Sequence, residues 1–149
     1  MHRLSIAALA VALALPASAE PVTVTDGDTI KSNGTTYRLW GIDAPEAKQW
    51  CGDYAAGAIS AAALAAMVEG ATHVACEAKA IDRYGRTVAI CRADGRDLGR
   101  DMVRLGMAWA FVRYSGHYAD DQDAARAEGL GVHRHACIPA WDWRASRRR

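Results

Sequence analysis

The stretch DGDTIKSNGTTYRLWGIDAPE, residues 26–46, combines a hairpin signal with a group of acidic side chains. Its central Asn33-Gly34 is a strong signal for a two-residue turn between antiparallel strands. A turn at this position places Thr29 opposite Arg38 in the strand pair. The stretch therefore predicts a β-hairpin near the start of the folded chain.

Four acidic residues lie in this stretch, namely Asp26, Asp28, Asp43 and Glu46. Crowded carboxylates repel one another, so such a group needs a cation, an arginine or open solvent. Our hypothesis is that Asp28, Asp43 and Glu46 face one divalent cation and one reacting phosphate, with Arg38 as their counter-charge. Strict alternation would point Asp28 and Arg38 to opposite faces, so the site requires the strand to end or bulge near Asp28. The alternative is a pair of acidic turns without chemistry.

Residues 1–19 have the pattern of a secretory signal peptide. A short basic start is followed by the apolar segment 4–16 and by Ala-Ser-Ala, which fits a small-residue cleavage site. The apolar run is shorter than the ~20 residues of a membrane-spanning helix. We therefore expect an exported protein, periplasmic or secreted, without membrane contact after cleavage. A buried first helix is the alternative.

Length and charge limit what residues 20–149 can form. These 130 residues suffice for one domain, which we expect to be monomeric, with its own core. The whole chain carries 18 basic and 17 acidic side chains. Such a balance does not attract a polyanion by net charge, so nucleic-acid binding would depend on where individual arginines are placed.

Turn signals and apolar spacing predict five strands and three helices. The strands are expected at 22–25, 29–32, 35–40, 72–78 and 86–92, and the helices at 53–69, 97–105 and 118–128. Asp53 and Asp97 are the expected N-caps of the first two helices, and a glycine follows each of the three. Early hairpins with helices between later strands suit a small barrel covered by helices, and we expect the five-stranded OB type.

The four cysteines of an exported chain predict two disulfides. A turn over residues 82–85, centred between its two middle residues, places Cys76 opposite Cys91 on neighbouring strands, near disulfide range. Cys51 is then paired with Cys137 by elimination alone.

A zinc site is the alternative for the last cysteine. His133 and His135 precede Cys137, and all three are residue types that bind zinc. Because no CxxC pair accompanies them, the disulfide is the favoured prediction.

Several motifs occur in a fixed order along the chain. They are DGDT at 26–29, RLWGIDAPE at 38–46, DRYGR at 82–86, GMAWA at 106–110 and GL at 129–130. With these motifs the chain resembles the thermonuclease family, the staphylococcal-nuclease-like domains, over essentially all of the segment after the signal peptide. The resemblance implies an OB-fold nuclease that uses Ca²⁺ to hydrolyse phosphodiester bonds in DNA and RNA.

The resemblance also implies a role for each matching residue. The Ca²⁺ ligands would be Asp28, Asp43 and the backbone carbonyl of Ala44, with Asp26 supporting them. The catalytic residues would be Glu46, which accepts a proton from water or positions it, and Arg38 and Arg86, which flank the phosphate. Arg83 and Tyr84 would contact a neighbouring phosphate or base.

These roles agree with the chemistry of the residue types. Ca²⁺ prefers carboxylate and carbonyl oxygens and accepts water and substrate as further ligands. Guanidinium groups match phosphate oxygens with two parallel hydrogen bonds. The competing prediction is a non-catalytic OB-fold module that binds nucleic acid without cutting it. The complete set of acids and arginines favours catalysis, and a Ca²⁺-stabilised structural domain would leave both arginines without a role.

Aromatic and basic residues of the C-terminal part receive less specific predictions. Trp109 is expected in the core and Tyr114 is a candidate substrate contact. The tryptophans of segment 141–143 are expected to pack the tail onto the domain. We expect Arg144 and residues 147–149 to form a solvated end rather than a nucleic-acid-binding arm.

Overall fold

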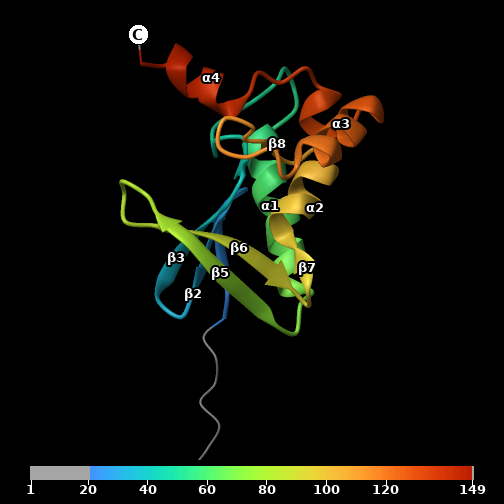
Figure 1. Ribbon diagram of the computed structural model, residues 1–149. Coiled ribbons are helices and arrows are strands. Elements are labelled where there is room, and N and C mark those ends of the chain that lie inside the picture. Colours follow the sequence, from blue (N-terminus) through green and yellow to red (C-terminus); the bar gives the residue numbers. More distant parts are fainter. Residues whose placement is uncertain (1–20, 149) are drawn as a thin grey trace, which may run out of the picture.

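The computed structural model describes residues 21–148, so the predicted signal peptide lies outside the described residues. A curved sheet with the strand order β1-β2-β3-β6-β5 forms its centre, and β7 pairs with β6 (Figure 1). The strands of this sheet are β1 (Thr23–Asp26), β2 (Thr29–Ser32), β3 (Thr35–Leu39), β5 (Val74–Ile81), β6 (Thr87–Ala93) and β7 (Arg96–Asp97). Two short strands, β4 (Ile42–Asp43) and β8 (Trp109–Ala110), pair separately. The five long strands confirm the predicted OB-type barrel.

Within residues 21–148, four α-helices accompany the sheet, one more than predicted. They are α1 (Ala56–Glu69), α2 (Leu98–Arg104), α3 (Ala119–Ala127) and α4 (Ala140–Ser146), and a 3-10 turn, η1 (Gly131–His133), precedes α4. Figure 1 shows α1, α2 and α3 together on one side of the sheet, whereas α4 lies near the C-terminus. Within residues 21–148, no helix combines the length and apolar character that crossing a membrane requires.

The start of α1 differs from the prediction. We expected a helix from residue 53 with Asp53 as its cap, but Cys51 and Tyr54 exchange backbone hydrogen bonds and form a small β-bridge. The helix therefore begins only at Ala56, and its N-cap, Ala55, provides no side-chain hydrogen bond. The prediction for α2 was accurate, because the Asp97 side chain accepts a hydrogen bond from the Arg100 N–H.

The first hairpin has the predicted register. Asn33 and Gly34 both have positive φ angles, 48° and 74°, as a two-residue hairpin turn of the primed type requires. Thr29 consequently pairs with Arg38. The pairing of β1 with β2 shifts between Val24 and Asp26, so a bulge lies just before the Gly27-Asp28 corner, where the site needed one.

The second hairpin reaches the predicted cysteine pair by a different route. Ile81 pairs with Thr87, so the turn is centred on Tyr84. The predicted centre, between Arg83 and Tyr84, was wrong. A register shift between Ala78 and Ala80 compensates, so Cys76 still faces Cys91 across the strands. The bulge thus restores the register that a two-residue turn would have given.

Both disulfides join the residues that the sequence suggested. The Cys76 and Cys91 sulfurs are 2.05 Å apart, and those of Cys51 and Cys137 are 1.99 Å apart. Because Cys137 is bonded to Cys51, it does not offer a thiolate to zinc.

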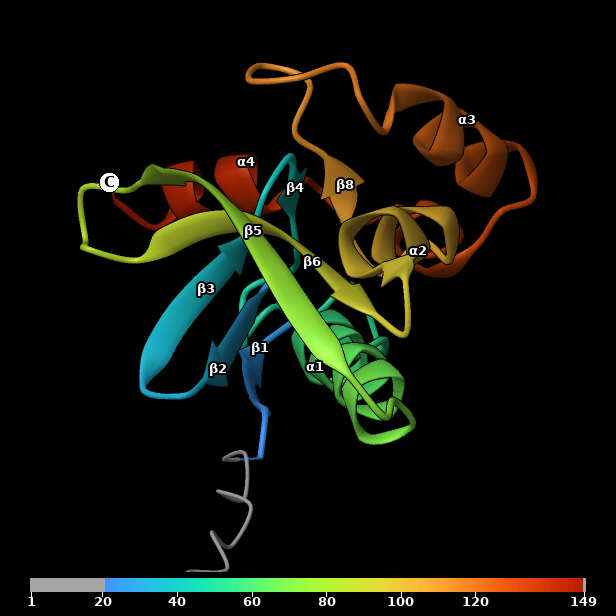
Figure 2. The ribbon, with the colours of Figure 1, turned by 60° about the horizontal axis from the view of Figure 1, so that its bottom comes forward.

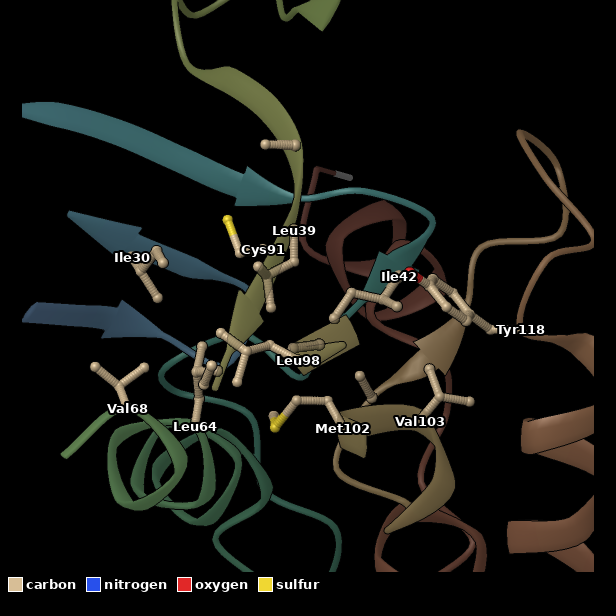
Figure 3. Packing of buried hydrophobic residues seen from close by; sticks show 14 of the residues in the cluster. Ile30, Leu39, Ile42, Leu64, Val68, Cys91, Leu98, Met102, Val103 and Tyr118 are labelled. Carbon is tan, nitrogen blue, oxygen red and sulfur yellow. The ribbon is translucent and has the colours of Figure 1, made fainter. Parts of the chain in front are cut away.

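The core lies between the sheet and the helices α1 and α2 (Figure 3). Its large buried side chains come from strands and helices alike: Ile30, Leu39, Ile42, Leu64, Leu98, Met102 and Val103. Burying each such side chain contributes about 1.5–3 kcal/mol before entropy is counted. Gly57 at the start of α1 permits the close approach of the loop after β4, since an added Cβ would lie 2.0 Å from the Glu46 carbonyl oxygen. The core thus fixes the ends of the strands that carry the acidic residues.

Candidate active site

Asp28 lies at the corner between β1 and β2, next to the end of β3. Its backbone N–H donates to the Asp26 carboxylate at 3.1 Å, and its carbonyl accepts from the Leu39 N–H at 2.8 Å. One carboxylate oxygen of Asp28 accepts a hydrogen bond from the Ala44 N–H at 3.0 Å. The corner therefore brings Asp28 to the segment that follows β4, and only 4% of the residue is exposed.

Arg38 links the two buried carboxylates. Its Nη1 lies 2.8 Å from Asp28 Oδ1, and its Nη2 lies 2.8 Å from Asp43 Oδ1. The side chain of Asp43 is fully buried, whereas 20% of the Arg38 side chain is exposed. The guanidinium thus neutralises charge at the base of the site while one edge still reaches solvent.

Arg144 of α4 is a further member of the site, and the expectation that it belongs to a solvated end was wrong. Its Nη2 lies 2.8 Å from Asp43 Oδ2, and its Nη1 lies 2.6 Å from Glu46 Oε1 and 3.2 Å from Asp43 Oδ1. The run of arginines at the C-terminus gives no local indication of this contact. The contact results from the Cys51–Cys137 disulfide, which brings the tail back to the β4 region.

Packing explains why α4 can hold this position. Trp141 lies edge-on to Trp109, with ring centroids 6.2 Å apart, and lies 5.5 Å from the ring of Phe111. Ala140 is completely buried, in a small cluster with Trp109. Gln49 Nε2 adds a hydrogen bond of 2.8 Å to the carbonyl just before the helix, that of Ile138. Trp109 therefore lies in a buried cluster, as expected, and α4 packs against this cluster.

The buried ion pairs shift the pKa values of their members. Burial raises the pKa of Asp28 to about 7, against the opposing effect of the Arg38 guanidinium. Burial alone would lower the pKa values of Arg38 and Arg144, but their carboxylate partners outweigh it and raise both. Both arginines therefore remain charged, and an additional cation beside Asp28 would lower its raised pKa.

Arg86 comes from the tip of the β5–β6 hairpin. Asp82 holds it there, since its carboxylate accepts hydrogen bonds from the Arg86 N–H at 3.0 Å and from Nε at 2.7 Å. Two arginines lie over the ring of Tyr84, with Arg83 Cζ 4.9 Å and Arg86 Cζ 5.6 Å from its centroid. The terminal nitrogens of Arg86 are thus left for a ligand.

A cleft of about 1180 Å³ joins these groups, and Figure 2 shows the hairpin tip and α4 on the same side of the barrel. Its lining includes the predicted residues Asp26, Asp28, Arg38, Ala44, Glu46, Arg83, Tyr84, Arg86 and Tyr114. Tyr114 is 78% exposed and packs against Phe111, at 4.9 Å between ring centroids. The predicted metal ligand Asp43 lies beneath the cleft surface, in contact with both arginines.

The donor set fits Ca²⁺ in chemistry. Asp28 and Asp43 offer oxygen ligands beside the backbone of Ala44, and Ca²⁺ accepts such ligands together with water. Across residues 21–148, however, no three acidic, histidine or cysteine side chains converge as a ready metal cluster. Guanidinium nitrogens fill the space between these carboxylates, so a bound cation would replace part of that charge pairing.

The comparison with known proteins identifies the family. A family model described as "Staphylococcal nuclease homologue" matches residues 36–134, about two thirds of the chain. The chain belongs to the staphylococcal nuclease family. The family match begins after Asp28 and ends before α4, so it includes Arg38, Glu46 and Arg86 but not Arg144.

Three relatives are similar to this chain over different lengths. An "Uncharacterized endonuclease" of Haemophilus influenzae is 36% identical over 118 residues, which cover 74% of this chain and 63% of that protein. This chain therefore spans less than two thirds of that relative. "Protein ParB" of Escherichia coli is 36% identical over 168 aligned positions, 97% of this chain and 90% of the relative. A "Micrococcal nuclease" of Shigella flexneri is 33% identical over 162 aligned positions, which cover 93% of this chain and 88% of that relative.

Proposed function

We propose that this protein is a Ca²⁺-dependent nuclease that hydrolyses phosphodiester bonds of DNA or RNA. The observation that carries the proposal is Arg38, which spans two buried carboxylates at the base of a cleft that Arg86 also lines. Family membership and the nuclease names of the relatives support the same reaction class.

In this proposal Asp28, Asp43 and the carbonyl of Ala44 hold the metal, and Asp26 orients the corner that carries Asp28. Bound Ca²⁺ would polarise a phosphoryl oxygen and help to orient water. The protein would contribute Glu46 as the acceptor or positioner of the water proton, because its carboxylate is partly exposed at the cleft.

The arginines would bind the phosphate. The Arg86 fork, oriented by Asp82, is suited to two phosphate oxygens, and the exposed edge of Arg38 is suited to another. Arg83, Tyr84 and Tyr114 would contact neighbouring nucleotides, the tyrosines by stacking on bases.

Export of the protein belongs to the same proposal. Two disulfides join all four cysteines, and such bonds persist in the periplasm or outside the cell. A nuclease in these compartments would meet nucleic acid that is not the genome of its own cell.

The test is cleavage of end-labelled single-stranded DNA and RNA by the purified protein, with Ca²⁺ or with excess chelator. We expect cleavage only with Ca²⁺. Retained binding of the strand without cleavage under any divalent cation would instead identify a non-catalytic binding module and would refute the proposal.

A further inference from the structure

The C-terminal helix α4 is a wall of the cleft as well as a cover of the core. The cleft is lined by Trp143 and Arg144 of α4 and by Arg147 and Arg148 directly after it, opposite the tip of the β5–β6 hairpin. Trp141 on the same helix packs into the small cluster around Trp109. One face of α4 is therefore anchored and the other faces the space where a substrate would bind.

The excess of positive charge lies at the C-terminal end of the sequence, in α4 and the residues that follow it. Residues 1–139 carry 14 basic and 16 acidic side chains, a net charge of −2. Residues 140–149 carry four arginines and one aspartate, a net charge of +3. Of these arginines, Arg144, Arg147 and Arg148 line the cleft, so a polyanion that enters it meets positive charge beside the candidate active site.

Contacts hold the side chains of two of these arginines, Arg144 and Arg147, in defined positions. The Arg147 guanidinium lies 4.1 Å from the ring centroid of Trp143, a cation–π contact that limits the positions of its side chain. Arg144 is fixed by Asp43 and Glu46. Arg147 and Arg148 are exposed, and the described structure gives neither of them an acidic partner within ion-pair distance.

We propose that the end of α4 and the two residues after it form a second phosphate-binding element, in which Arg147 and Arg148 bind the backbone of a single-stranded nucleic acid next to the phosphate at the active site. The proposal rests on the proposed nuclease function, because it places the same strand in the same cleft. The hairpin tip with Arg83 and Arg86 forms the opposite wall.

A single strand fits this cleft better than a duplex on chemical grounds. Tyr84 and Tyr114 line it with ring surfaces that are 69% and 78% exposed as whole residues. Aromatic rings stack on bases only when those bases are unpaired. Phosphate contacts from the two basic walls would leave the bases free to reach these rings.

The test measures binding without cleavage. Two fluorescent strands of the same sequence, a single-stranded DNA and an RNA, are titrated in chelator at several salt concentrations. Each strand is titrated with the wild type and with the double variant Arg147→Ala/Arg148→Ala. For single strands the slope of log K against log salt is about −0.7 per phosphate contact, so losing two contacts should make the slope shallower by about 1.4. We expect this change for at least the DNA strand.

The matched control is Arg96→Ala/Arg126→Ala, which removes two exposed arginines outside the cleft lining. This control should keep the wild-type slope. An unchanged slope in the α4 variant, or an equal change in both variants, would overturn the proposal, the second because it would show a general charge effect. Wild-type cleavage with Ca²⁺ is scored separately, so failure of the nuclease proposal remains distinguishable from failure at α4.

Discussion

Arg144 binds Asp43 through both of its terminal nitrogens, although 101 positions separate the two residues in the chain. Asp43 is fully buried and also accepts a hydrogen bond from Arg38. The negative charge of this buried carboxylate is therefore already paired with two guanidinium groups, whose removal would leave it uncompensated. The same arrangement makes the site sensitive to any change in the number of cations around Asp43.

Arg144→Ala should increase the affinity for Ca²⁺ in the absence of nucleic acid. Removing this guanidinium frees oxygens of Asp43 and Glu46, and it leaves a negative site that attracts the cation more strongly. Isothermal titration with Ca²⁺ measures the affinity directly. In chelator the variant should lose about 1–3 kcal/mol of unfolding free energy, and Ca²⁺ should restore most of it. Weaker Ca²⁺ binding than in the wild type would contradict this account of Arg144.

Arg38→Ala and Arg86→Ala should slow cleavage strongly, by about 10³-fold or more, because the first removes the exposed guanidinium edge and the second the free fork that would bind the phosphate. Single-turnover rates on labelled DNA provide the measurement. Arg104→Ala is the matched control, since Arg104 pairs with Glu128 on the surface between α2 and α3. Wild-type rates in both site variants would show that the reaction takes place elsewhere.

Arg86→Lys separates charge from shape at the same position. The lysine keeps the positive charge but cannot donate two parallel hydrogen bonds or repeat the Nε contact with Asp82. We expect a rate between those of the wild type and Arg86→Ala. Equal rates for Arg86→Lys and the wild type would show that only the charge is needed.

The two disulfides should contribute unequally to stability. Cys51–Cys137 closes a loop with a sequence separation of 86, against 15 for Cys76–Cys91. By the chain-entropy relation, the longer loop contributes about 4.6 kcal/mol and the shorter about 3 kcal/mol. Urea unfolding of Cys51→Ser/Cys137→Ser and Cys76→Ser/Cys91→Ser compares them. A larger loss for the second pair would mean that the native contacts around it outweigh loop closure.

His133 should make stability depend on pH. Burial, with a smaller effect of Arg126, lowers the pKa of its imidazole, and its Nε2 has no hydrogen-bond partner among the described residues. Because the folded pKa is below the unfolded value of about 6.5, the unfolded state binds the proton more readily. The stability that depends on a neutral His133 is therefore fully present above about pH 6.5, and it is lost as pH falls through the folded pKa.

The measurement for His133 is urea unfolding of the wild type and His133→Leu at several pH values between 5 and 8. The variant should lose less stability than the wild type as pH is lowered, since it has no imidazole to protonate. Parallel curves for the two proteins would exclude this role of His133. Comparing the two curves cancels the contributions of the other titratable groups.

The sequence predicted the parts of this protein that depend on short-range patterns. The Asn33-Gly34 turn set the pairing of Thr29 with Arg38, and the local motifs identified the residues that line the cleft. The predicted centre of the second turn was wrong by half a residue. Cys76 nevertheless faces Cys91, because a bulge in β5 shifts the register back. Bulges depend on how the sheet bends over its core, so no short pattern indicated this one.

The role of Arg144 could not be predicted from its neighbours. It lies in a run of arginines, and such a run is usually a solvated end. Its partners, Asp43 and Glu46, lie about a hundred residues earlier, and a disulfide inferred only by elimination brings them close. The only available signal was the combination of Cys137 with the apolar Trp141, which together indicate a tail that returns to the domain.

The link between Cys51 and Cys137 also bears on how the cleft is completed. The bond can form only where thiols are oxidised, and Cys137 follows all the strands and η1 in the chain. Before that moment α4 is held by non-covalent packing alone, so Arg144 reaches Asp43 and Glu46 less firmly. The barrel can thus fold first, and oxidation then completes the second wall of the cleft. Completion of this wall would accordingly depend on the redox state of the compartment as well as on folding.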